Sequence, residues 1–248
     1  MKLIEYKEVQ GTIKCLTGLK IGGTKDSLGI GETDNPIIRH PITRLPYIPG
    51  SSMKGKIRSL LELRYSEVSQ RTGLVCFCGN CTICSMFGHG LPKKSDVSNY
   101  ERKYDVGIKP IDEPTRLIFR DAFLTEESEN ELKETLPGSF VEVKTEIAMD
   151  RKTGNAARGA LREQERIPEG MEFGFTMTIR LFEEDEPRSK EFFGMLGEAF
   201  ELLEDDYLGG NGTRGYGQVE ITYFDPEAEE GDEAEVISMS KYLKRLAV

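Results

Sequence analysis

Four of the five cysteines in this 248-residue chain lie within nine residues, in the run Cys76-Phe-Cys78-Gly-Asn-Cys81-Thr-Ile-Cys84. Thiolate is a soft ligand, and four thiolates suit a closed tetrahedral zinc site that leaves no open position for catalysis. The spacing predicts a structural zinc, with either Cys76 or His89 as its fourth ligand. Two other interpretations stay open: an iron–sulfur cluster, of which part of the ferredoxin spacing is present, and no metal at all.

A second group of polar residues lies in the loop from Gly22 to His40. A carboxylate here can hold Mg²⁺ beside a phosphate group. The alternative is a polar surface loop in which Asp34-Asn-Pro sets a turn. The charged residues of this loop and its borders are Lys20, Lys25, Asp26, Glu32, Asp34, Arg39 and His40.

Two glycine-containing segments carry basic side chains. A helix that starts after Pro49-Gly-Ser-Ser presents free N–H groups and the positive end of its dipole, with Lys54, Lys56 and Arg58 in its first two turns. This favours a phosphate site; the alternative is an ordinary capped helix with solvated lysines. Five glycines fall within Gly209–Gly217, where Arg214 adds a phosphate-binding fork.

The polar arm 140–168 carries basic and acidic side chains in nearly equal numbers. We weigh two interpretations equally, a mobile loop and an arm that wedges against a nucleic acid or a neighbouring subunit.

Charge is distributed unevenly along the chain, whose net charge is −10. Residues 1–60 hold ten basic and five acidic side chains, whereas residues 183–235 hold three basic and eighteen acidic ones. A polarised molecule can bind RNA on its basic side, although such an asymmetry also arises by chance. The N-terminus has no apolar signal region and no apolar run approaches a membrane span, so we expect a cytoplasmic protein.

The elements that must position these groups follow from apolar periodicity. We expect strands at 4–22, 116–124, 171–182 and 215–224. We expect helices from a cap at Ser51 or Ser52 through Leu63, and at 126–135, 188–204 and 236–246. Without the insertions 67–112 and 140–168, the order is β-α-β-β-α-β, which predicts an α+β, ferredoxin-like (RRM-like) core in one domain that ends at residue 224.

The chain resembles the backbone subunit of type III-A (Csm) CRISPR effector complexes, in the RAMP superfamily. Four segments carry the resemblance: Thr17–Gly23, Asp34–Arg39, Tyr47–Gly55 and Leu208–Val219. The cysteine cluster followed by Phe87-Gly88 fits as well. The order and spacing of these segments span nearly the whole chain.

The resemblance implies a subunit repeated along a guide CRISPR RNA as a filament, together with the other subunits of the effector. It implies cleavage of complementary target RNA at regular intervals by a metal-dependent endoribonuclease, with Mg²⁺ or another divalent ion and Asp34 as the catalytic residue. Guide RNA binding falls to Lys20, Lys54, Lys56, Arg58, Gly210 and Arg214. The parts implied are a palm (1–66, 113–139 and 169–224), a zinc-bound insertion (67–112), a thumb hairpin (140–168) and an acidic linker with a C-terminal helix (225–248).

One position departs from the family pattern, because Lys20 stands where a histidine is common. A lysine can contact phosphate but does not serve as an acid–base group at neutral pH without a large pKa shift. Two alternatives remain: an architectural RNA-binding subunit that does not cut, and a stand-alone RAMP endonuclease that processes RNA. The carboxylate of Asp34 argues against the first, and the presence of only two histidines argues against the second.

Overall fold

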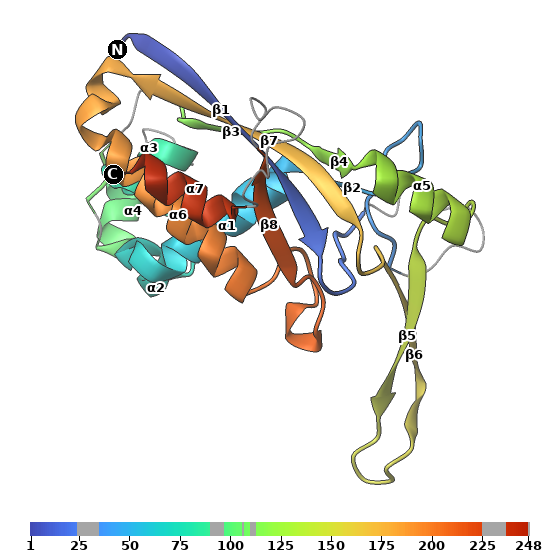
Figure 1. Ribbon diagram of the computed structural model, residues 1–248. Coiled ribbons are helices and arrows are strands. Elements are labelled where there is room, and N and C mark those ends of the chain that lie inside the picture. The colour runs from blue at the N-terminus through green and yellow to red at the C-terminus, as the bar shows by residue number, and fades with distance from the viewer. Residues whose placement is uncertain (24–34, 90–96, 106, 110–112, 225–236, 248) are drawn as a thin grey trace.

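The computed structural model describes residues 1–23, 35–89, 97–105, 107–109, 113–224 and 237–247. Its main sheet is antiparallel, in the order β2-β4-β7-β1-β8, and β3 also pairs with β7. Its strands are β1 Leu3–Cys15, β2 Tyr47–Ile48, β3 Leu117–Phe119, β4 Ala122–Leu124, β7 Glu172–Phe182 and β8 Val219–Phe224. A two-stranded hairpin, β5 Glu142–Met149 and β6 Ala156–Arg166, projects from the body (Figure 1).

Three helices, α1, α6 and α7, pack together beside the sheet (Figure 1). Their apolar faces meet the strands, and the ring of Phe200 on α6 stacks on Phe175 of β7 with centroids 6.1 Å apart. The helices are α1 Gly50–Tyr65, α2 Glu67–Thr72, α3 Thr82–Phe87, α4 Val97–Tyr104, α5 Glu126–Thr135, α6 Ser189–Asp205 and α7 Met239–Leu246, with 3₁₀ turns at Glu183–Arg188 and Gly212–Arg214.

Strand β1 occupies a central place because its second half alternates. Val9, Ile13 and Cys15 are fully buried, and alternate residues of a strand face the same side. Ile13 lies opposite Phe173 of β7 and Ile221 of β8, so one residue joins three strands. Burying each such side chain contributes about 1.5–3 kcal/mol.

Several expected elements are confirmed. The helices at 126–135 and 188–204, the strand at 171–182 and the helix near 236–246 all form, as α5, α6, β7 and α7. The arm 140–168 contains the hairpin β5–β6. Periodic apolar residues predicted α6 and β7, and the glycine turn at Gly154 indicated the hairpin.

The expectation of one strand over 116–124 is wrong. The chain breaks between β3 and β4 at Arg120-Asp121, where the Asp121 carboxylate accepts the Gly50 N–H at 2.8 Å. A Cβ on Gly50 would lie 2.5 Å from the Phe119 carbonyl oxygen. The strand therefore breaks where the start of α1 docks against it.

The expected cap at Ser51 or Ser52 is also wrong. Helix α1 begins at Gly50 after Pro49, without a cap from its own side chains, and Asp121 binds the first N–H instead. Negative charge stabilises a helix N-terminus, so a carboxylate of the protein already occupies the place suggested for a phosphate.

Two further boundaries differ from expectation. The first strand ends at Cys15, because the chain then leaves the sheet and forms isolated bridges such as Leu19 with Ile167. The last strand begins at Val219, after the glycine-rich loop. In the part of the insertion 67–112 that the structure describes, the chain forms the short helices α2, α3 and α4. Within the described residues, no helix is both long and apolar enough to cross a bilayer.

Candidate nucleic-acid interface and metal centre

The glycine-rich loop, Gly209–Gly217, packs backbone to backbone on the segment that follows β1. The Gly210 N–H donates to the Lys20 carbonyl at 2.8 Å, and the Gly217 N–H donates to the Gly18 carbonyl at 3.1 Å. Gly209 has φ +77°, and a Cβ there would lie 2.3 Å from the Lys20 oxygen. The glycines therefore permit close packing of two chain segments, and they hold the backbone of Lys20 in place.

The side chain of Lys20 reaches the base of the hairpin. Its Nζ donates to Oε1 of Gln164 on β6, and burial lowers the pKa of Lys20. Asn35 forms an isolated bridge with the same Gln164, and the Glu165 N–H donates to the Asn35 carbonyl at 3.3 Å. One strand end thus brings Lys20 next to the segment that follows Asp34.

Asp34 itself lies outside the described residues, as do Lys25, Asp26 and Glu32. The chain after it is firmly held. Oε2 of the buried Glu165 accepts the Ile37 N–H at 3.1 Å and pairs with Arg39 at 2.9 Å. Arg39 also donates to the Ser139 carbonyl at 2.5 Å.

The three basic residues of α1 have different surroundings. Within the described chain, no carboxylate pairs with Lys54; burial, then Arg58 and Arg180, lower its pKa. Lys56 pairs with Asp206 at 2.6 Å and lies 3.6 Å above the ring of Tyr207. Lys54 is therefore the one of the three whose charge is not already balanced by a carboxylate of the described chain.

Arg58 faces the cysteine cluster. Its Nε pairs with Glu62 at 2.7 Å, and its Nη2 donates to the Cys76 carbonyl at 3.0 Å. Glu62 in turn accepts the Cys76 N–H at 3.0 Å. This contact attaches the insertion to α1, whatever else Arg58 binds.

Arg214, in the glycine-rich loop, is exposed and faces the hairpin. Its Nη1 lies 3.2 Å from Oε2 of Glu146 on β5, and the Tyr216 hydroxyl donates to Oε1 of Glu146 at 3.0 Å. Gly210 has room around it, since its added Cβ would meet no atom closer than 3.8 Å. The backbone of the loop is accessible at that position.

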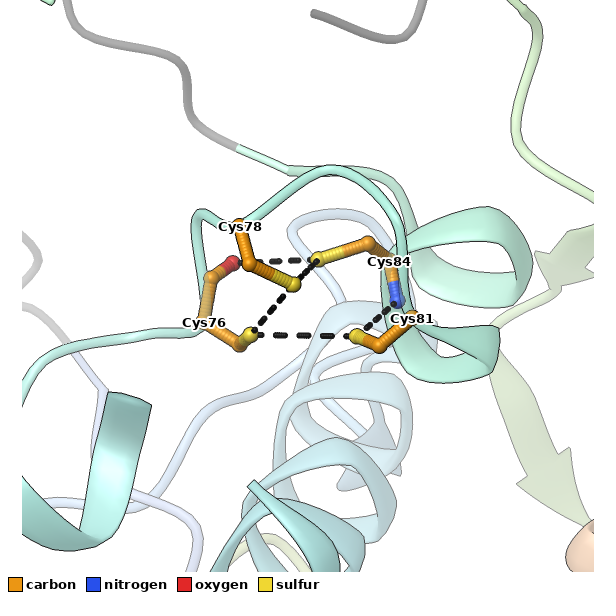
Figure 2. A group of neighbouring side chains, drawn as sticks. All are labelled: Cys76, Cys78, Cys81 and Cys84. Atoms are coloured by element: carbon orange, nitrogen blue, oxygen red, sulfur yellow. Dashed lines mark hydrogen bonds between the residues drawn. The ribbon is translucent and has the colours of Figure 1, made fainter. Parts of the chain in front are cut away.

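The four cysteine sulfurs form a compact cluster (Figure 2). All lie within 4.8 Å of one another, with Sγ–Sγ distances of 3.5, 3.8 and 3.9 Å for three of the pairs. A tetrahedral zinc with Zn–S bonds of about 2.3 Å requires sulfurs about 3.8 Å apart. The cluster can therefore hold a metal ion, and it consists of Cys76, Cys78, Cys81 and Cys84 without His89.

Helix α3 helps to build this cluster. Cys81 is its N-cap, and its Sγ accepts the Cys84 N–H at 3.4 Å. A helix N-terminus stabilises thiolate, which is the form that binds metals. The fifth cysteine, Cys15, is buried in the main core, where burial raises the pKa of its thiol to about 12.

Sequence reasoning missed four residues that organise the interface: Glu146, Gln164, Glu165 and Tyr216. All but Tyr216 lie on the hairpin, and its mixed charges do not indicate which of its side chains turn toward the rest of the chain. The pairing of the two strands shows which face of the hairpin Glu146 lies on. It lies opposite Arg162, on the same face as Lys144.

Comparison with known proteins agrees with the resemblance. The family model of the RAMP superfamily matches residues 12–220. The "CRISPR system Cms endoribonuclease Csm3" of Methanothermobacter thermautotrophicus is 44% identical over 216 residues, covering 86% of this chain and 82% of that protein. The protein of the same name from Methanocaldococcus jannaschii is 40% identical, covering 86% and 77%.

The fold of this chain is also similar to that of a solved structure. The crystal structure of Csm3 from Methanopyrus kandleri covers 87% of this chain and 75% of its own, with a TM-score of 0.54 and 24% identity. The mixed α/β architecture with antiparallel sheets is thus that of the superfamily. The chain belongs to the RAMP superfamily and, within it, to the Csm3 family.

Proposed function

We propose that the chain is the repeating backbone subunit of a type III-A CRISPR effector complex. In this role it binds guide CRISPR RNA along a helical filament with copies of itself and the other Csm subunits, and it cleaves complementary target RNA at regular intervals. The relatives' name, endoribonuclease, supports the cleavage activity. One observation carries the proposal: Lys20, the glycine-rich loop and the segment after Asp34 meet at the base of one hairpin.

The same proposal includes the ferredoxin-like core and its insertions. Strands β1, β4, β7 and β8 with helices α1 and α6 follow the expected β-α-β-β-α-β order along the chain. Their order across the sheet, β4-β7-β1-β8, places the first and last strands side by side. The hairpin β5–β6 is the thumb, and residues 67–112 are the metal-bound insertion.

Within this subunit, Lys54 and the glycine-rich loop bind the phosphate backbone of the guide. Lys54 suits this task because its charge is partly desolvated and has no carboxylate partner in the described chain. We assign Lys20, Lys56, Arg58, Gly210 and Arg214 to guide binding as well, although each of them also contacts a group of the protein.

Asp34 is the catalytic residue and the ligand for a divalent metal such as Mg²⁺. When bound, the metal polarises a phosphoryl oxygen and offsets its developing charge. The chain's own task is alignment: the RNA backbone is held so that a 2′-hydroxyl lies in line with the adjacent phosphorus. The cysteine cluster holds a structural zinc, with Cys76 as its fourth ligand.

Purification of the effector complex from cytoplasmic extract, followed by analysis of the RNA that it carries, tests this function. The chain is co-expressed with the other Csm subunits and a guide array, and the RNA in the purified complex is sized. We expect guides whose lengths differ by equal steps, and less RNA with Lys54→Glu than with Lys103→Glu, an exposed lysine on α4. A monomer that cleaves repeat hairpins, or a complex without RNA, would contradict the proposal.

A further inference from the structure

A cavity of about 410 Å³ lies between the hairpin and the glycine-rich loop. Figure 1 shows the hairpin standing away from the sheet, and Arg214 of the loop is hydrogen-bonded to Glu146 on β5. Its charged lining comes from three separate segments: β5, β6 and the loop. The lining residues are Lys144, Glu146, Ile147, Ala148, Ala160, Arg162 and Arg214.

The register of the hairpin explains this lining. Lys144 and Glu146 lie two residues apart on β5, so they share the face of the hairpin that turns to the loop. Across the strands, Arg162 lies directly opposite Glu146. Three cations therefore surround a single carboxylate in a chain whose net charge is −10.

Glu146 has a double contact inside this cavity. Its two oxygens accept from Arg214 and from the Tyr216 hydroxyl, at 3.2 and 3.0 Å. The buried Tyr216 ring lies 4.8 Å from Lys144 Nζ and 5.2 Å from Arg166 Cζ. The carboxylate thus sits among donors whose arrangement also suits the oxygens of a phosphate.

We infer that this cavity is a binding site for one phosphodiester group of a polynucleotide, and that Glu146 occupies the place of the phosphate in the RNA-free protein. The inference rests on the proposed function. RNA exchanges the Arg214–Glu146 pair for an Arg214–phosphate pair, and the hairpin is thereby released from the glycine-rich loop. Lys144 and Arg162 attract the incoming phosphate and balance the displaced carboxylate.

Glu146→Gln tests the site in the full chain, with a fluorescein-labelled 24-nucleotide polyuridine and fluorescence anisotropy at low salt. Removing the competing charge should tighten RNA binding about fivefold, the scale of one partly exposed ion pair. Glu163→Gln, on the same hairpin but outside the cavity, should change it less than twofold. In an Arg214→Ala background, the gain from Glu146→Gln should also fall below twofold.

Amide hydrogen exchange of the RNA-free protein gives an independent readout. Glu146→Gln should raise exchange in residues 142–149 and 209–217, and Glu163→Gln should not. If the wild-type chain binds RNA and Glu146→Gln binds it no more tightly, or if the gain persists without Arg214, the site is overturned. If the wild-type chain binds no RNA, the proposed function fails and the site with it.

Discussion

Arg58 on α1 donates a hydrogen bond of 3.0 Å from Nη2 to the carbonyl oxygen of Cys76. Glu62, which pairs with Arg58, accepts the N–H of the same residue, so Arg58 and Glu62 together bind both backbone groups of Cys76. The helix that carries Lys54 and the cysteine cluster therefore form one mechanical unit. This relationship makes the cluster a support for the helix that we propose to bind RNA.

Replacing Arg58 with Lys should destabilise the protein by about 1.5–3 kcal/mol, because one ammonium cannot satisfy both Glu62 and the Cys76 carbonyl. Urea denaturation measures the change. Arg64→Lys is the matched control, since the pair of Arg64 with Glu198 is more exposed and should cost less than about 1 kcal/mol. An equal loss of unfolding free energy in the two variants would show that the hydrogen bond from Arg58 to Cys76 adds no stability.

Cys76→Ser should lower the metal content of the purified chain well below one ion per molecule, because serine is a poor ligand for a soft site. Elemental analysis gives the content and identifies the metal. Cys15→Ser removes a cysteine from the core and should leave the content unchanged. A full metal complement in Cys76→Ser, lost instead in His89→Ala, would reassign the fourth ligand.

Gly209→Ala should cost about 2 kcal/mol or more, since alanine is strained at φ +77° and its Cβ would press on the Lys20 carbonyl. Gly55→Ala on α1 has open space and should stabilise by about 0.5–1 kcal/mol through helix propensity. Thermal unfolding of both variants is the measurement. A neutral Gly209→Ala would contradict the close packing of the loop on Lys20.

Lys54→Ala should weaken RNA binding and lower the slope of log affinity against log salt by about one, as expected for the loss of one phosphate contact. Lys56→Ala should change the slope less, because Asp206 and Tyr207 already engage its ammonium. Titrations at several salt concentrations compare the two. Identical slopes would mean that the free charge of Lys54 has no special part in binding.

Several elements of the main sheet and its helices could be predicted from the sequence because they have strong local patterns. Phe192, Leu196, Phe200 and Leu203 repeat at helical spacing and form the buried face of α6. The cysteine cluster was equally readable, because ligand spacing within nine residues is a local property. Its own helix, α3, starts at the cluster.

Tertiary contacts account for what the sequence could not show. Asp121 breaks a strand and caps α1 from 71 residues away, which no local pattern reveals. Lys20 meets Gln164 across 144 residues for the same reason. The glycine-rich loop predicted a polyanion site, whereas Gly209 and Gly217 are first required by the packing of the chain on itself.

The central claim is that Asp34 cleaves target RNA held by this subunit, and cleavage by the reconstituted effector tests it most directly. With Asp34→Ala, we predict that complementary target is bound within about twofold of wild type while its cleavage rate falls at least about 100-fold. Asp26→Ala, in the same loop, serves as the control and should retain cleavage. Wild-type cleavage by a complex containing only Asp34→Ala subunits would contradict the account.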